Sequence, residues 1–226
     1  MIDLRCCDVA EVLDEVRGAA LVTADPPWVY NCKQARDHGG ASSDFACVGE
    51  HYDTLTLDDI AAHVSASYAC ATDSARLLLW TTFPQLADWM AADAGRWRYV
   101  TGGAWTKDDR LGQGHHWRGM VEPLLVYVKG SNAPINMATG NAYISKRTEH
   151  SQKPMEWLCT LLETWTNPGD LVLDLYAGLA PMARACKATG RDYIGAEIDP
   201  ERHRHAMAKL DGTPWHRDVR QIGLGI

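Results

Sequence analysis

The chain has 226 residues, of which 46% are hydrophobic and 23% charged, with a formal net charge of −7. This length predicts one globular domain, residues 1–226, that buries about 70% of the surface exposed by the unfolded chain. The acidic balance excludes a protein that coats nucleic acid non-specifically, although a local basic face still allows binding. The apolar runs are far shorter than a membrane span, so we expect no membrane partner.

The seven cysteines form no CxxC pair and no spacing typical of a disulfide framework, and no histidines stand at zinc-binding distances beside them. The first residues do not resemble a signal peptide. We therefore expect a reduced, cytoplasmic protein without a metal.

Strand-like and helix-like patterns alternate along the chain and predict an α/β fold with a mostly parallel sheet of seven strands. The predicted strands cover 2–6, 19–24, 75–81, 97–106, 123–129, 171–175 and 192–198. The predicted helices cover 8–16, 56–70, 84–94, 154–166, a segment after the turn at Gly178 up to 189, and 200–210. Thr56 and Asp59 match a helix-capping pair. Long polar loops are expected at about 31–54, 107–120 and 130–149.

The segment Asp25-Pro26-Pro27-Trp28 follows the apolar run 19–24, where a buried parallel strand is predicted to end. Two prolines fix φ near −65° and remove two N–H donors, which predicts a stiff turn with outward carbonyl oxygens. A carboxylate, a carbonyl and an indole plane suit an exocyclic amino group on a flat ring. Ordinary core packing is the alternative for Trp28, and a turn or N-cap role is the alternative for Asp25.

A second strand–turn–helix pattern runs from Asp174 through Tyr176-Ala177-Gly178, and the next strand ends at Glu197 and Asp199. Nucleotides bind outside the carboxyl ends of strands in doubly wound folds, and an acid there suits the ribose hydroxyls of an adenosyl group. The absence of a GxGxxG pattern disfavours a dinucleotide and a nicotinamide dehydrogenase, and favours S-adenosylmethionine. The strands that end at Ala24 and Asp174 must then be neighbours bordering one cleft.

Taken together, these residues resemble the permuted adenine-N6 methyltransferases, which include bacterial and bacteriophage DNA adenine methylases and the catalytic subunit of the eukaryotic mRNA adenosine methyltransferase. The resemblance covers nearly the whole chain. It rests on Cys6-Cys7-Asp8, Asp25-Pro26-Pro27-Trp28, 77–80 (LLLW), 105–107 (WTK), 112–115 (GQGH), 122–130 (EPLLVYVKG), 150–154 (HSQKP) and the set Asp174, Gly178 and Glu197.

The resemblance implies a Rossmann-like, S-adenosylmethionine-dependent methyltransferase fold with a circularly permuted motif order. It implies Cys7 and Asp8 near the cofactor's adenine, Lys153 near its methionine carboxylate and Glu197 at its ribose. The expected catalytic residues are Asp25, Pro26, Pro27 and Trp28. The expected cofactor-binding residues are Cys7, Asp8, Asp25, His150, Lys153, Asp174, Tyr176, Ala177, Gly178, Glu197 and Asp199. The expected substrate contacts are Trp28, Tyr30, Lys107, His115 and Arg118, with solvated charge as the alternative for Lys107 and Arg118.

The expected reaction is in-line methyl transfer to the 6-amino group of a flipped-out adenine in DNA, which leaves S-adenosylhomocysteine and needs no metal. We expect a monomer or homodimer in the cytoplasm of a bacterium or of a bacteriophage-infected cell. One departure from the family concerns the segment Gly178-Leu179-Ala180-Pro181, where DNA methylases usually carry a second glycine or serine.

Two classes of alternative remain. One keeps methyl transfer but changes the acceptor to RNA adenosine, a cytosine amino group or a glutamine amide. Cytosine enzymes of this kind more often have serine, and glutamine enzymes asparagine, where this chain has Asp25, so adenine is favoured. The other alternative is a catalytically inactive nucleic-acid-binding partner subunit, which the retained Asp25, Trp28, Gly178 and Glu197 disfavour.

Overall fold

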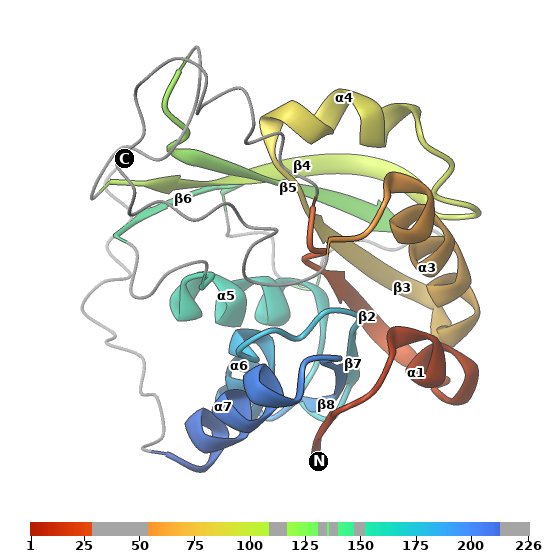
Figure 1. Cartoon of the computed structure of the whole chain (residues 1–226), viewed down its shortest axis with the longest axis vertical. Helices are drawn as coiled ribbons and strands as arrows, with labels where there is room; N and C mark the ends of the chain where they lie inside the picture. The colour runs from red at the N-terminus through yellow and green to blue at the C-terminus, as the bar shows by residue number, and fades with distance from the viewer. Residues whose placement is uncertain (29–53, 109–116, 131–134, 136–139, 147–151, 213–226) are drawn as a thin grey trace.

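The computed structural model describes residues 1–28, 54–108, 117–130, 135, 140–146 and 152–212 (Figure 1). Within these residues, a single sheet of eight strands lies between two groups of helices, six in all, so the expected α/β class is confirmed. None of the helices in this part of the chain is both long and apolar enough to cross a membrane.

The strands lie in the order β1-β8-β7-β2-β3-β5-β4-β6. Strands β1, β8, β7, β2 and β3 are parallel, whereas β5 runs antiparallel to both of its neighbours, β3 and β4. The sheet is therefore mixed, with its parallel half at the β1 edge. The strand bounds are β1 Ile2–Arg5, β2 Ala19–Ala24, β3 Ala71–Trp80, β4 Arg98–Lys107, β5 Val121–Val128, β6 Ala142–Ser145, β7 Leu171–Asp174 and β8 Asp192–Ala196.

Strand β6 corrects the expected count of seven, because it lies inside the segment predicted as a polar loop at 130–149. It pairs in parallel with β4, from Ala104 opposite Ala142 to Lys107 opposite Ser145. It has four residues at the sheet edge, and their side chains alternate between exposed and half-buried. So short an edge strand carries little of the apolar periodicity that identifies a strand.

Helices cover both faces of the sheet, as the alternation of side chains along the strands requires (Figure 1). Leu21 and Leu78 pack into one apolar cluster with α5, α6 and α7. Val22 and Leu77 pack into the other cluster with α1, α3 and α4. The helix bounds are α1 Val9–Glu15, α3 Leu57–Cys70, α4 Phe83–Ala91, α5 Met155–Trp165, α6 Pro181–Thr189 and α7 Pro200–Asp211.

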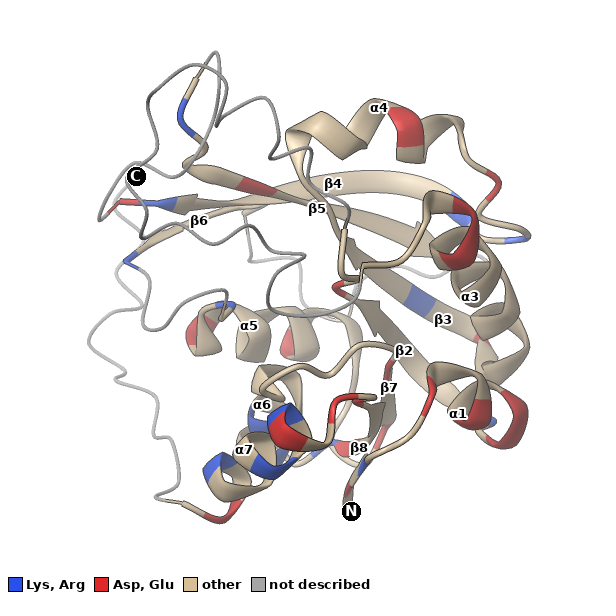
Figure 2. Ribbon diagram, viewed as in Figure 1, with Lys and Arg blue, Asp and Glu red and all other residues tan. Residues whose placement is uncertain are grey.

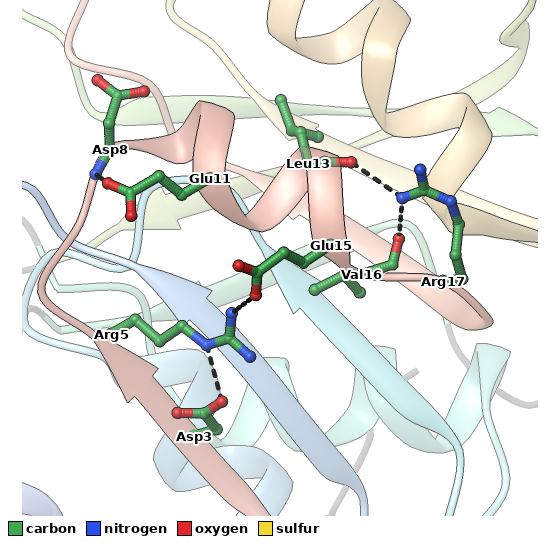
Figure 3. Close-up of polar contacts among 8 residues, drawn as sticks. All are labelled: Asp3, Arg5, Asp8, Glu11, Leu13, Glu15, Val16 and Arg17. Atoms are coloured by element: carbon green, nitrogen blue, oxygen red, sulfur yellow. Dashed lines mark hydrogen bonds and ion pairs between the residues drawn. The ribbon is translucent and has the colours of Figure 1, made fainter.

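Short polar side chains cap the helices α1 and α3. Thr56 and Asp59 form the predicted capping box of α3, which is thereby confirmed. Asp8 and Glu11 form a second capping box at α1: the Asp8 side chain accepts from the Ala10 N–H at 2.8 Å, and the Asp8 N–H donates to Glu11 at 3.2 Å (Figure 3). These caps fix where the loops leave the sheet.

Candidate active site

Three acids stand at the carboxyl ends of three adjacent parallel strands. Asp25 follows β2, Asp174 ends β7 and Glu197 follows β8. In the register of these strands, Thr23 lies opposite Asp174, and Asp174 lies opposite Gly195. The expectation that the Asp25 strand and the Asp174 strand are neighbours is thus confirmed, and the two predicted halves of the site share one edge of the sheet.

The turn after β2 is stiff, but its carbonyl oxygens are not wholly free as the sequence suggested. The Trp28 N–H donates to the Pro26 carbonyl at 2.9 Å, and the Leu55 N–H donates to the Pro27 carbonyl at 3.1 Å. Each carbonyl still has a second lone pair. A ligand amino group can therefore share the Pro26 oxygen but does not have it to itself.

The Trp28 indole lies in the core rather than in the open. Its side chain is 4% exposed, and its ring meets Trp89 edge to face at 6.0 Å. Its indole N–H donates to the Trp80 carbonyl at 3.2 Å. This geometry corresponds to the packing alternative, in which Trp28 holds the turn in place, while stacking on a base stays a prediction.

Lys153 joins the Asp25 carboxylate to a second acid, Glu122 on β5. Its Nζ lies 2.5 Å from Asp25 Oδ2 and 3.2 Å from Glu122 Oε2, and 4.9 Å from the centre of the Trp80 ring. Glu122 is also hydrogen-bonded to Lys107 on β4. Four side chains of alternating charge therefore run from the end of β2 across β5 to β4.

Lys153 is buried in this network, whereas Asp25 is accessible. The Lys153 side chain is 8% exposed and that of Asp25 is 41% exposed. Burial alone would lower the pKa of Lys153, but Asp25 and Glu122 outweigh it and raise the pKa well above its usual range. Burial would likewise raise the pKa of Glu122, but Lys153 and Lys107 hold it below its ordinary value. Burial raises the pKa of Asp25, although Lys153 opposes the rise. Lys153 and Glu122 are thus held in their charged forms, and a ligand can reach Asp25.

Asp174 is buried at the end of β7 and accepts a hydrogen bond from the Tyr193 hydroxyl at 3.0 Å. Burial raises the pKa of Asp174 to about 7, with the Tyr193 hydroxyl and the backbone N–H of Tyr176 opposing the rise and Asp25 and Glu197 adding to it. Asp25 and Glu197 therefore lie close enough to Asp174 to disfavour its charged form.

Glu197 lies against the glycine turn that follows β7. Its carboxylate accepts from the Asp199 N–H at 3.0 Å, and burial raises its pKa, although the backbone of Asp199 and of Gly178 favours its charged form. Gly178 has φ 56°, and a Cβ added there would meet only the Arg202 side chain, at 3.5 Å. The backbone of this turn is therefore open to close approach by a ligand.

Several residues expected at the cofactor have local structural roles as well. Asp8 caps α1, and Asp199 caps α7 by accepting from the Glu201 N–H at 2.7 Å. The Tyr176 hydroxyl lies 2.9 Å from Nδ1 of His63. Each carboxylate keeps an oxygen beyond the one used in its cap, so these roles do not exclude ligand contacts.

Two further residues expected at the cofactor, Ala177 and Cys7, are described by the structure, and three other expected site residues are not. Ala177 is buried, and its N–H donates to the Ala196 carbonyl at 2.8 Å, so it ties β7 to β8. Cys7 is half-buried, and burial raises the pKa of its thiol. The remaining predicted residues, Tyr30, His115 and His150, lie outside the described residues.

Besides Trp28, the described residues that were expected to contact substrate are Lys107, which ends β4, and Arg118, which precedes β5. The side chain of Lys107 is 14% exposed and pairs with Glu122, so it is not displayed to solvent as a phosphate contact would be. Arg118 is exposed, beside Trp117, which is 91% exposed. Sequence reasoning missed the role of Glu122, although a lone acid at the start of the apolar run 122–128 was a signal.

A comparison with known families was decisive. A family profile described as DNA methylase, covering N6 and N4 enzymes, matches residues 21–208 of the chain. The chain belongs to the DNA methylase family.

Two relatives of this chain are Escherichia coli (strain K12) proteins. It is 34% identical over 77 residues, 34% of the chain, to "Putative methylase YubD" and 31% identical over 104 residues, 41% of the chain, to "DNA adenine methyltransferase YhdJ". The chain spans about a third of the length of these relatives, 34% and 35% respectively.

Solved structures share the fold of this chain over almost its whole length. The M1.HpyAVI–SAM complex matches with a TM-score of 0.68 at 18% identity, covering 93% of this chain and 100% of that one. PvuII DNA methyltransferase, described as cytosine-N4-specific, matches with a TM-score of 0.68 at 11% identity, covering 94% of this chain and 87% of that one. The fold is therefore that of known methyltransferases, and it is common to an enzyme of the cytosine-N4 type.

Proposed function

We propose that this DNA methylase transfers a methyl group from S-adenosylmethionine to the 6-amino group of adenine in DNA, and that Asp25 receives this amino group. The observation that carries the proposal is the accessible Asp25 carboxylate at the end of β2, directly beside the strand that ends in Asp174. This edge of the sheet is where α/β folds bind nucleotide ligands.

The choice of adenine rests on the residue type at the head of the motif. Asp25 stands where resembling cytosine enzymes more often have serine, and a carboxylate accepts a hydrogen of an amino group more strongly than a hydroxyl does. The relative YhdJ is described as an adenine methyltransferase. Cytosine N4 is the second candidate, because the fold is shared with the PvuII enzyme.

The residues at β7 and β8 fit S-adenosylmethionine. Its sulfonium and ammonium groups are cations, its ribose carries two hydroxyl donors, and it has no phosphate. Asp174 and Glu197 supply acceptors and negative charge, and the open backbone at Gly178 allows close contact. Asp8 and Cys7 would border the adenine ring, and Lys153 would reach the methionine carboxylate. When bound, the cofactor supplies an electrophilic methyl group on a good leaving group.

The work of the protein is then to position and polarise the acceptor. Asp25 accepts one hydrogen of the amino group and the second lone pair of the Pro26 carbonyl accepts the other, which favours a pyramidal nitrogen with its lone pair available. Positioning and fixed charges of this kind supply most of the barrier reduction, and no strong base is required. In duplex DNA the target base must leave the stack, at an expense of a few kcal/mol.

The proposal is tested with Asp25→Ala, assayed by transfer of labelled methyl groups to unmethylated DNA. Loss of the acceptor for the amino group is expected to lower kcat on the order of 100-fold. The fold should persist, because Glu122 still neutralises Lys153. Asp211→Ala, an exposed substitution at the end of α7, serves as the matched control.

Thermal unfolding of both variants separates chemistry from stability. A folded Asp25→Ala protein that methylates DNA at nearly the wild-type rate contradicts the proposed role of Asp25. RNA is assayed beside duplex and single-stranded DNA. Methyl transfer to RNA alone would identify RNA adenosine, not DNA, as the substrate.

A further inference from the structure

Glu122 is a largely buried acid with two cationic partners, and the proposed reaction does not yet use it. Its Oε2 lies 3.2 Å from Lys153 Nζ, and its Oε1 accepts from Lys107. Its side chain is 20% exposed, against 8% for Lys153. It therefore stands directly behind the lysine that contacts the reactive acid, Asp25.

Stability alone is a weak explanation for this arrangement. Withdrawing several charges from water is costly, and apolar residues of similar size often serve as well or better in such positions. A single Lys153–Asp25 pair would already be neutral. The second acid, Glu122, has its own counter-ion in Lys107. Because Glu122 also contacts Lys153, the positive charge of Lys153 is shared between Glu122 and Asp25.

The ammonium of Lys153 has three N–H donors. One reaches Asp25 Oδ2 at 2.5 Å and another Glu122 Oε2 at 3.2 Å, while the Trp80 ring bounds the ammonium at 4.9 Å. Trp80 is 2% exposed and so forms a fixed wall. Glu122 and Trp80 thus decide where the ammonium sits relative to Asp25.

We propose that Glu122 is a positioning residue, which holds Lys153 between two carboxylates so that Asp25 is only partly neutralised and keeps an oxygen for the incoming amino group. This inference rests on the proposed function, because it assumes that Asp25 receives the amino group. Glu122 lies on β5, outside the Asp-Pro-Pro-Trp turn and the cofactor edge, and is thus a further determinant of the rate.

Removing the charge of Glu122 gives a defined expectation. In Glu122→Gln the ammonium of Lys153 is drawn to Asp25 alone, and the amino group must compete with it. We expect kcat to fall about tenfold or more, while the KM for DNA changes less than about twofold. A substitution that acted only through folding would not separate kcat from KM in this way.

The pH dependence provides a second readout. The charged groups of the described residues that face Lys153 are Asp25 from the end of β2 and Glu122 from β5, with Lys107 on β4 behind Glu122. The neighbour from β3, Trp80, is uncharged. With one carboxylate gone, Lys153 should lose its proton at lower pH, so the alkaline limb of the kcat profile should move to lower pH in Glu122→Gln.

The decisive measurement does not require activity. The protein is labelled with ¹³C at lysine Cε, the Lys153 signal is assigned by its loss in Lys153→Arg, and its titration is followed by NMR in wild type and Glu122→Gln. Glu15→Gln, which changes an exposed glutamate paired with Arg5 (Figure 3), is the matched control. If Glu122→Gln does not fold, Glu122→Asp, which withdraws the carboxylate by one methylene, takes its place with the same expected direction.

A Lys153 signal that titrates at lower pH in the variant, with kcat reduced and KM retained, supports the proposal. An unchanged titration or an unchanged kcat overturns it. Failure of the wild-type protein to methylate adenine would overturn the proposed function instead, and the NMR titration would still report whether Glu122 holds Lys153.

Discussion

At the scale of single residues, the three acids of the site differ in how far water reaches them. Asp174 is 4% exposed and Glu197 9%, whereas the Asp25 side chain is 41% exposed. The acid that is open to solvent is the one assigned to the acceptor, and the two buried acids face the proposed cofactor. Burial raises the pKa of both acids, so a cation bound beside them would favour their charged forms.

The pKa of about 7 at Asp174 predicts a pH-dependent stability. In the unfolded chain this carboxyl has a pKa near 3.9, so between about pH 4 and 7 the folded state holds a proton that the unfolded state lacks. Asp174 therefore contributes most to the free energy of unfolding below pH 4, and this contribution is lost as the pH rises through 7. The loss amounts to at most about 4 kcal/mol.

Asp174→Asn should remove this dependence. We measure the free energy of unfolding of both proteins by denaturant unfolding at each pH. The value for wild type minus the value for Asp174→Asn is expected to fall as the pH is raised from 5 to 8. Asp14→Asn, an exposed substitution on α1, should show no such trend. A difference between wild type and Asp174→Asn that stays constant across this range would contradict the assignment.

Ala180 carries the departure from the family pattern in its backbone. It adopts φ 52° and ψ 47° at the start of α6, where the resembling DNA methylases usually have glycine or serine. The left-handed conformation costs a residue with a Cβ roughly 1–2 kcal/mol. The turn beside the proposed cofactor site is therefore strained in this chain.

Ala180→Gly should relieve this strain while losing one buried methyl group, worth about 0.8 kcal/mol. The free energy of unfolding is therefore expected to stay within about 1 kcal/mol of wild type. Ala183→Gly, equally buried but inside α6, loses the methyl group and helix propensity together, about 2 kcal/mol. Equal losses in the two variants, measured by denaturant unfolding, would show that Ala180 is not strained.

At the scale of elements, features that depend on neighbours in sequence could be predicted. Thr56 and Asp59 are three residues apart, and their capping box is present as expected. The apolar run 19–24 was predicted as a strand with the bounds that β2 has. The adjacency of β2 and β7 followed from requiring two motifs to border one cleft.

Contacts between distant residues could not be predicted in the same way. Asp25 and Lys153 are 128 positions apart, and no pattern in either segment specifies their hydrogen bond. The burial of Trp28 depends on Trp89 from α4, which packs over it from another layer. The pairing of Lys107 with Glu122 likewise depends on the register of β4 and β5, in which Trp105 lies opposite Glu122.

The described residues 117–120, which precede β5, lie at the edge of the sheet where DNA is expected to approach. Arg118 is exposed, and β4 runs in the same direction as β3, so the start of β5 lies at the edge that carries Asp25. If Arg118 neutralises a phosphate, Arg118→Gln should weaken binding to all sequences and reduce the salt slope of affinity by about one. Arg98→Gln, at the opposite end of β4, should leave the slope unchanged. Affinities measured between 50 and 200 mM salt check this, and an unchanged slope in Arg118→Gln would identify a merely solvated charge.

At the scale of the whole molecule, charge is unevenly distributed over the two helical layers (Figure 2). Within their bounds, α1, α3 and α4 contain acids and no lysine or arginine. Basic residues gather on α6 and α7, among them Arg184, Lys187, Arg202, Arg204 and Lys209. The acidic layer repels phosphates, so DNA is expected to approach the carboxyl edge of the sheet rather than that face.

The central claim, methyl transfer to adenine N6 at this edge, is tested most directly by identifying the product. Purified protein is incubated with methyl-labelled S-adenosylmethionine and unmethylated DNA, and the DNA is digested to nucleosides for mass spectrometry. The account predicts labelled N6-methyladenine and no labelled N4-methylcytosine. Label in N4-methylcytosine, or none in DNA from a protein shown to be folded, would contradict it.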